Sequence, residues 1–101
     1  MAKAQLNFGE LGGSNVIVDD LGTINNTADA SGLRTATTSK DFTGCSKIGY
    51  WVSAPSLGAD GKVMLEITNV TSNSITYKLI YYPNGDYSSF PYDQHIILFG
   101  I

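Results

Sequence analysis

The sequence predicts a single all-β domain over residues 1–101, a small antiparallel β-sandwich of about six to eight strands. Three observations support this fold class. Strand-forming residues occur throughout the chain, and no segment of about twelve residues or more places apolar side chains at helical spacing. Glycine and small polar residues interrupt the chain at intervals of roughly eight to twelve residues, which is typical of sandwiches and barrels. A chain of 101 residues has room for one domain.

The first half of the chain carries the weaker strand patterns. Residues 5–11 alternate weakly between polar and apolar side chains, residues 15–19 form a short strand, and a Gly-Gly turn separates the two. Residues 20–41 are rich in Thr, Asn, Ser and Gly, with isolated apolar side chains. We therefore expect a loop there, with one or two short strands.

From residue 46 onward the strand patterns become clear. Residues 46–54 predict a strand that ends before Pro55, because proline cannot donate a backbone hydrogen bond. Residues 62–70 and 74–82 both alternate and are joined by a short polar turn, which predicts a β-hairpin. Alternation places Val63, Leu65 and Ile67 on one face of the first strand and Met64, Glu66 and Thr68 on the other, while Ile75, Tyr77, Leu79 and Tyr81 share a face of the second strand.

Within the final segment 95–101 (HIILFGI), residues 96–99 are apolar on both faces. Exposing one such face would cost several kcal/mol, at about 25 cal/mol per Å² of apolar area. Two interpretations remain open: a central strand of a two-layer sandwich, or a strand whose outer face packs against a neighbouring subunit. We favour the second, because an interface would also stabilise a small chain that has no disulfide. The residues predicted for this oligomer interface are Ile97, Phe99 and Ile101.

Charge and composition exclude several classes of partner. Charged residues make up only 15% of the chain, its formal charge is −3, and its six Lys and Arg residues are scattered singly. Nucleic-acid binding needs a basic stripe, so it is not expected. Membrane insertion is not expected either, because no stretch approaches the ~18 apolar residues of a span. The first residues lack the features of a signal peptide. We therefore expect synthesis in the host cytoplasm and release by lysis, as for a virion component.

The reactive residue types are too few for a catalytic or metal centre. Cys45 and His95 are the only cysteine and histidine, and zinc sites need several such ligands. Asp19, Asp20 and Asp29 match no calcium loop. No acid–base pair with supporting residues is evident, so we predict a non-enzymatic protein without a metal or cofactor. Cys45 is interpreted as a packing residue and His95 as a strand-edge residue.

The polar and aromatic segment 83–94 is the best candidate for a ligand site. Aromatic rings stack on the C–H faces of sugars, and neighbouring polar side chains supply the hydrogen bonds that sugar hydroxyls require. A loop of this length in a compact domain is often functional. Packing is the competing interpretation, and we assign Tyr50, Trp51 and Tyr81 to it. The candidate ligand-binding residues are Tyr87, Phe90, Tyr92, Asn84, Asp86 and Asp93.

Residues 42–101 resemble the H-type lectin domain and the related C-terminal tips of bacteriophage tail fibres. The resemblance is carried by the hairpin sequence LEITNVTSNSITYKLIYY, in which Ile67, Asn69, Val70, Thr71 and Ile75 match the family pattern. It implies a six-stranded antiparallel sandwich, a homo-trimer, and glycan-binding loops at one end. The chain departs from the lectins in its final strand, which contains no Trp, and it has no counterpart of their sugar-gripping arginine and Trp-His step.

Together these patterns predict a binding module, namely a phage tail-fibre or virion-associated receptor-binding domain that recognises a cell-surface glycan or protein receptor. Two alternatives remain. The chain is either a structural virion protein, a capsid decoration or tail assembly component that acts through contacts with other virion proteins, or a stand-alone bacterial lectin-like protein. In all three hypotheses the protein acts through an exposed surface.

Overall fold

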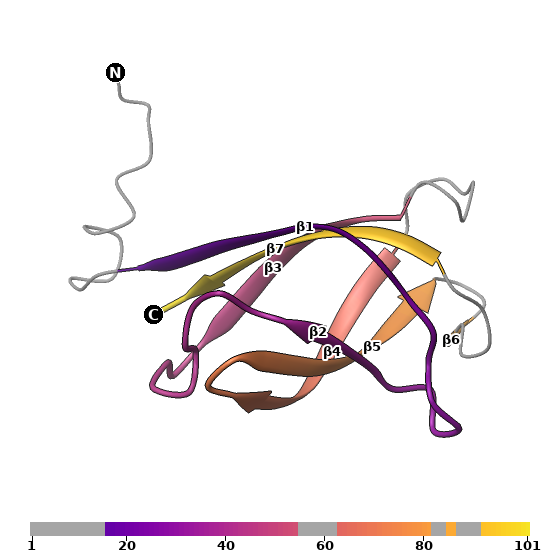
Figure 1. The fold of residues 1–101 in the computed structure, drawn as a ribbon, viewed down its shortest axis with the longest axis horizontal. Coiled ribbons are helices and arrows are strands. Elements are labelled where there is room, and N and C mark those ends of the chain that lie inside the picture. The colour runs from indigo at the N-terminus through magenta and orange to yellow at the C-terminus, as the bar shows by residue number, and fades with distance from the viewer. Residues whose placement is uncertain (1–15, 55–62, 82–84, 87–91) are drawn as a thin grey trace, which may run out of the picture.

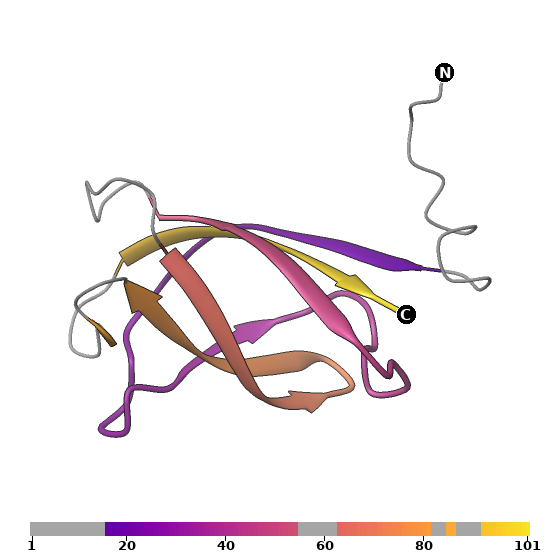
Figure 2. The same ribbon diagram turned by 180° about the vertical axis from the view of Figure 1, so that it is seen from behind.

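The computed structural model describes residues 16–54, 63–81, 85–86 and 92–101, and its regular elements are all strands (Figures 1 and 2). Among these residues no helix is long and apolar enough to cross a membrane. The strands are β1 (Ile17–Asn26), β2 (Arg34–Thr37), β3 (Ile48–Ser53), β4 (Val63–Thr71), β5 (Ser74–Tyr81), the two-residue β6 (Gly85–Asp86) and β7 (Tyr92–Gly100).

The strands form two small sheets in which every pairing is antiparallel. The first sheet has the order β1-β7-β3, and the second has the order β2-β5-β4, with β6 paired to β5. In Figure 1 the first sheet lies above the second, and β1 lies beside β7 although the two are far apart in the sequence. The all-β prediction is therefore confirmed.

The predicted hairpin is present as β4 and β5. Leu65 lies opposite Leu79 in the register, and both are buried, whereas Met64 is exposed. The alternation predicted for β4 holds up to Ile67, where a register shift before Asn69 marks a bulge. The buried positions of β5 are Ile75, Tyr77 and Leu79, as the period of two predicts.

The prediction for residues 15–41 was wrong in one respect, because β1 continues through Asn26. A register shift between Asp20 and Thr23 interrupts the alternation on which the prediction rested. Gly22 has a φ of 71°, a left-handed conformation that glycine adopts readily, and its N–H donates to Asp20 Oδ1 at 2.9 Å. Thr-rich β2 is one of the expected short strands. The pattern predicted for residues 5–11 lies outside the described residues.

β7 is the central strand of its sheet, between β1 and β3. Ile96 and Leu98 are fully buried on its inner face, while Ile97 and Phe99 on the opposite face are half-buried and Ile101 remains 42% exposed. Packing inside the domain therefore explains why the inner-face residues of this segment are apolar. Coverage of the opposite face by another subunit stays a prediction.

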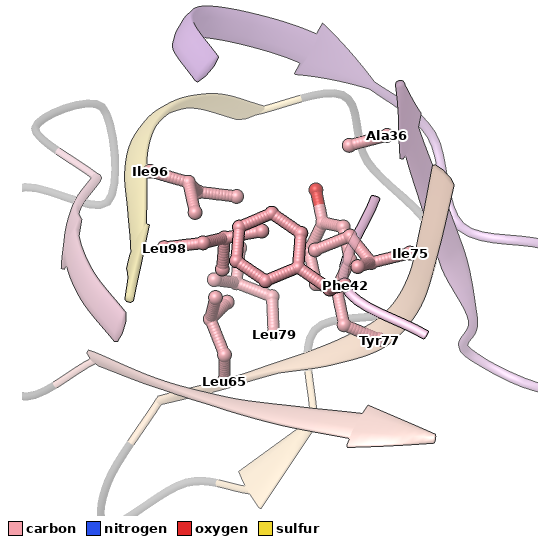
Figure 3. Packing of buried hydrophobic residues seen from close by; sticks show 8 residues of the cluster. All are labelled: Ala36, Phe42, Leu65, Ile75, Tyr77, Leu79, Ile96 and Leu98. Atoms are coloured by element: carbon pink, nitrogen blue, oxygen red, sulfur yellow. The ribbon is translucent and has the colours of Figure 1, made fainter. Parts of the chain in front are cut away.

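One hydrophobic core takes side chains from both sheets (Figure 3). Phe42, from the connection between β2 and β3, lies in the middle of the cluster and is 1% exposed. The other members are Ala36, Leu65, Ile75, Tyr77, Leu79, Ile96 and Leu98. Because burying such side chains supplies most of the folding free energy, this shared core holds the two sheets together.

A closed ring of three hydrogen bonds lies beside this core and also joins the sheets. Tyr77 Oη donates to Gln94 Oε1 at 2.6 Å, Gln94 Nε2 donates to Asn26 Oδ1 at 2.8 Å, and Asn26 Nδ2 donates to Tyr77 Oη at 3.0 Å. The buried Arg34 donates from Nη1 to the backbone oxygen of Asn26 and to its Oδ1. The ring connects β1, β5 and β7, and burial raises the pKa of the Tyr77 phenol.

Gly100 is required for close packing between β7 and the loop before β3. A Cβ at this position would lie 2.5 Å from Cys45 Sγ and 2.8 Å from Phe42 Cδ2. We expect Gly100→Ala to lower the free energy of unfolding by about 1–3 kcal/mol, the usual cost of overpacking. Gly49→Ala on the adjacent strand is the matched control, because a Cβ there meets nothing within 4 Å. Urea denaturation of both variants measures the difference, and equal stabilities would contradict the packing argument.

Replacing Tyr77 by Phe tests the hydrogen-bond ring. The change removes a donor to Gln94 Oε1, which is fully buried, and one of two acceptors for Asn26 Nδ2, which also donates to the backbone oxygen of Thr35. We expect a loss of about 1–3 kcal/mol, since a buried polar group without its partner retains its desolvation cost. The same denaturation series repeated from pH 7 to pH 11 adds a second readout.

The sign of the pH effect follows from the raised pKa of Tyr77. The folded state favours the neutral phenol, so stability is unaffected below the ordinary tyrosine pKa of 10.0 and falls as the pH rises toward the higher folded value. The wild-type chain should therefore lose more stability between pH 9 and pH 11 than Tyr77→Phe. Parallel curves for the two proteins would show that Tyr77 does not titrate with unfolding.

Candidate functional site

The outer face of the β1-β7-β3 sheet, the face turned away from the core, is the candidate site. Because Ile96 and Leu98 point inward, their alternating neighbours in β7 point outward. Residues directly opposite one another on paired strands share a face. The outer face is therefore built from Asp93, His95, Ile97 and Phe99 of β7, Val18, Asp20, Thr23 and Asn25 of β1, and Gly49, Trp51 and Ser53 of β3.

The outer face is polar at one end and apolar at the other. At the polar end, where β7 begins, Asn25 Nδ2 donates to Asp93 Oδ1 at 2.8 Å. At the apolar end, where β7 finishes, Val18 is 37% exposed and lies opposite Phe99. Trp51 lies between the two ends and is 48% exposed, more than any other large hydrophobic side chain in the described part of the chain.

A row of three side chains crosses all three strands at the middle of the outer face. His95 Nε2 donates to Asp20 Oδ1 at 2.8 Å, and the rings of His95 and Trp51 meet edge to face with their centroids 5.2 Å apart. Asp20 Oδ1 also accepts from the N–H of Gly22, within the β1 bulge. This backbone hydrogen bond and then the His95 hydrogen bond lower the pKa of Asp20. The carboxylate is therefore ionised at neutral pH and fixes the imidazole.

Asp20, His95 and Ser53 are the residue types of a hydrolase triad, but their arrangement differs from one. In such triads the carboxylate is buried and the second imidazole nitrogen contacts the nucleophile. Here the Asp20 side chain is 57% exposed. Ser53 lies opposite His95 in the register, yet no hydrogen bond joins them in the described structure. The row places an exposed aromatic ring beside hydrogen-bonding groups that are fixed in the sheet.

The aspartates considered for calcium do not come together. Asp19 is buried on the inner face and accepts from the N–H and hydroxyl of Ser39 and the N–H of Lys40. Asp20 faces outward, and Asp29 Oδ1 accepts from the backbone within its own turn. Across residues 16–54, 63–81, 85–86 and 92–101, no group of three or more His, Cys, Asp or Glu side chains could hold a metal ion.

Only part of the predicted ligand site lies in the described structure. Asn84, Tyr87 and Phe90 lie outside it. For Asp86 and Tyr92 the structure gives the backbone position alone: Asp86 lies opposite Ile80, and Tyr92 opposite Asn26. Asp93 lies on the outer face, at its polar end.

Tyr50 and Trp51, which the sequence analysis assigns to packing, are both partly exposed. Both are on β3, which pairs with β7 on one side and with no described strand on the other. Tyr50 faces inward opposite Leu98 but is still 36% exposed, because it lies at the edge of the sheet. Trp51 is on the outer face. Sequence reasoning therefore missed the Asp20–His95–Trp51 row, since its members approach only through the pairing of β1 and β3 with β7.

Comparisons with known proteins give no match: no family model fits the sequence, and no curated protein or solved structure is significantly similar to the chain.

Asp20→Asn tests whether the ionised carboxylate of Asp20 stabilises the folded protein. A carboxyl whose pKa is lowered by folding stabilises the protein above its ordinary pKa of 3.8, and this stabilisation is lost as the pH falls. Asp20→Asn should therefore be less stable than wild type at pH 7, and the difference should shrink toward pH 3. Urea midpoints at pH 7, 5 and 3 measure it, with Asp93→Asn as the control for removing a negative charge from the same face. A stability difference between wild type and Asp20→Asn that is the same at pH 7, 5 and 3 would contradict the lowered pKa of Asp20.

Proposed function

We propose that this chain is a non-enzymatic binding module whose outer face recognises a cell-surface glycan, as a tail-fibre or other virion-associated receptor-binding domain does. The observation that carries the proposal is the exposure of Trp51 beside His95 and Asp20. Large aromatic side chains are normally withdrawn from water, and an exposed one held next to fixed polar groups is typical of a recognition surface.

The chemistry of this surface fits a hydroxyl-rich ligand. The exposed part of the indole offers an apolar plane for the C–H groups of a sugar ring. Asp20 and Asp93 supply carboxylate acceptors, while Thr23 and Ser53 supply hydroxyls that donate and accept. These groups are fixed by a sheet and by hydrogen bonds, so little conformational entropy is lost when they bind a ligand.

The predicted aromatic segment extends the same proposal. Asp93 lies on the outer face and directly follows Tyr92, the first residue of β7. We propose that Asn84, Asp86, Tyr87, Phe90 and Tyr92 contribute to the same ligand site.

The finer architecture belongs to this proposal as well. We propose that the two sheets are the layers of a β-sandwich and that three copies associate through the apolar end of the outer face. Val18 and Ile101 are 37% and 42% exposed there, beside the half-buried Ile97 and Phe99. Burying these side chains against another copy would add about 25 cal/mol per Å² of apolar area. The polar end would remain open to the ligand.

A structural virion protein is the second candidate, and the apolar end of the outer face favours it. Exposed apolar residues grouped on one sheet face mark protein contacts as well as ligand sites. In that case the partner would be another virion protein. Detection of the chain at high copy number in purified virions, away from the fibre, together with no glycan binding, would support this second function over the first.

Trp51→Ala tests the proposed function. On an array of bacterial surface polysaccharides, we expect the variant to lose about tenfold or more in affinity, equivalent to about 1.4 kcal/mol. Met64→Ala is the matched control, because Met64 is 47% exposed but lies on β4 in the other sheet. Thermal unfolding shows whether each variant is folded. Equal binding by wild type and Trp51→Ala, or no binding by the wild type to any surface polysaccharide, would refute the proposal.

A further inference from the structure

The outer face of the β1-β7-β3 sheet carries two carboxylates near its exposed indole. Asp20 lies opposite Ile97 in the register, and Ile97 lies opposite Trp51 on its other side. Asp20 and Trp51 are thus two strand spacings apart, about 10 Å between their Cα atoms. The ring of His95 contacts both of their side chains. Asp93 precedes His95 by two residues and lies about 7 Å from it along β7, on the same face. A sugar chain that stacks on the indole and extends along this face therefore lies beside both carboxylates.

Each carboxylate keeps one oxygen available for a ligand. Asp20 Oδ1 accepts from the N–H of Gly22 and from His95, and these hydrogen bonds lower the pKa of the Asp20 carboxyl. Asp93 Oδ1 accepts from Asn25. Among the residues that the structure describes, no hydrogen bond reaches Oδ2 of either aspartate, and both side chains are exposed. The two Oδ2 atoms can therefore accept from a bound ligand without breaking a contact of the fold.

No fixed positive charge balances these carboxylates where the ligand would lie. The described outer-face residues between the polar end and Trp51 include no Lys or Arg. Lys47 lies about 13 Å from Trp51 along β3, toward the apolar end. Lys40 Nζ donates to the backbone oxygen of Val18, also at the apolar end. The imidazole of the central row is hydrogen-bonded to a carboxylate. This part of the outer face therefore attracts cations and repels anions.

We propose that the outer face selects a sugar that carries an unsubstituted amino group, whose ammonium form binds Asp20 and Asp93. This inference rests on the proposed glycan-binding function and names the class of glycan. An ammonium group donates up to three hydrogen bonds, and a charge-assisted hydrogen bond to a carboxylate is about twice as strong as one from a neutral hydroxyl. N-acetylation turns the ammonium into a neutral amide with a single N–H. Sugars that carry carboxylate, sulfate or phosphate groups are repelled by the two aspartates.

A matched pair of oligosaccharides tests the proposal, namely a glucosamine oligomer and its fully N-acetylated counterpart. Calorimetric titration at pH 6.5 compares them, because the amine is then protonated and both carboxylates are ionised. We expect the wild-type chain to bind the glucosamine oligomer about threefold or more tightly than the acetylated one, as two exposed ion pairs would give. The preference should shrink in 1 M salt, where the screening length falls to about 3 Å.

Three variants assign the preference to residues. Asp20→Asn and Asp93→Asn should each lower the ratio of the two dissociation constants toward one, because each removes one acceptor of the ammonium. The ratio is measured within one protein, and thermal unfolding shows that each variant is folded. Glu66→Gln is the matched control, since it removes an exposed carboxylate from β4 in the other sheet and should keep the wild-type ratio.

The results separate this proposal from the proposed function. If the wild-type chain binds surface polysaccharides but prefers the acetylated oligomer, shows no preference, or binds only glycans without amino groups, the proposal is overturned while the proposed function stands. A preference that is unchanged in both aspartate variants also overturns it. Absence of binding to every glycan would refute both.

Discussion

The hydrogen-bond ring of Tyr77, Gln94 and Asn26 determines which side chains of the first sheet point toward the core. A buried amide is costly unless its donors and acceptors are paired, and Gln94 is fully buried with its amide inside the ring. A shift of one residue in β7 would turn Gln94 toward solvent and bring Asp93 or His95 inside. The ring therefore selects the register, and the register in turn places the polar residues and Trp51 together on the outer face.

The second half of the fold could be predicted because its apolar residues report directly on burial. In β4 and β5 the alternation of apolar and polar residues matches the buried and exposed sides. In β1 and β2 this signal fails. Asp19 and Arg34 occupy buried positions, where their hydrogen bonds replace apolar contacts. Their partners are remote in the sequence or in loops, so no local pattern distinguishes these strands from a polar loop.

The candidate site was less predictable than the fold for a related reason. Trp51 was assigned to packing because tryptophan in a strand usually lies in a core or an interface. Its exposure depends on β3 being an edge strand, and its contact with His95 depends on the pairing of β3 with β7. Asp20 joins them only because the β1 bulge keeps its carboxylate beside the imidazole. The exposure of Trp51, its contact with His95 and the position of Asp20 therefore all depend on the pairing of strands that are distant in the sequence.

The central position of β7 has a consequence for the synthesis of the chain. β1 and β3 each pair with β7, which is made after every other strand in the described structure. While the ribosome is still translating, β4 and β5 can already pair through their short turn, but β1 and β3 have no neighbour. In the nascent chain β1 and β3 would remain unpaired until β7 is made, and long-range strand pairings of this kind form slowly. The β1-β7-β3 sheet can therefore form only after β7 has been made.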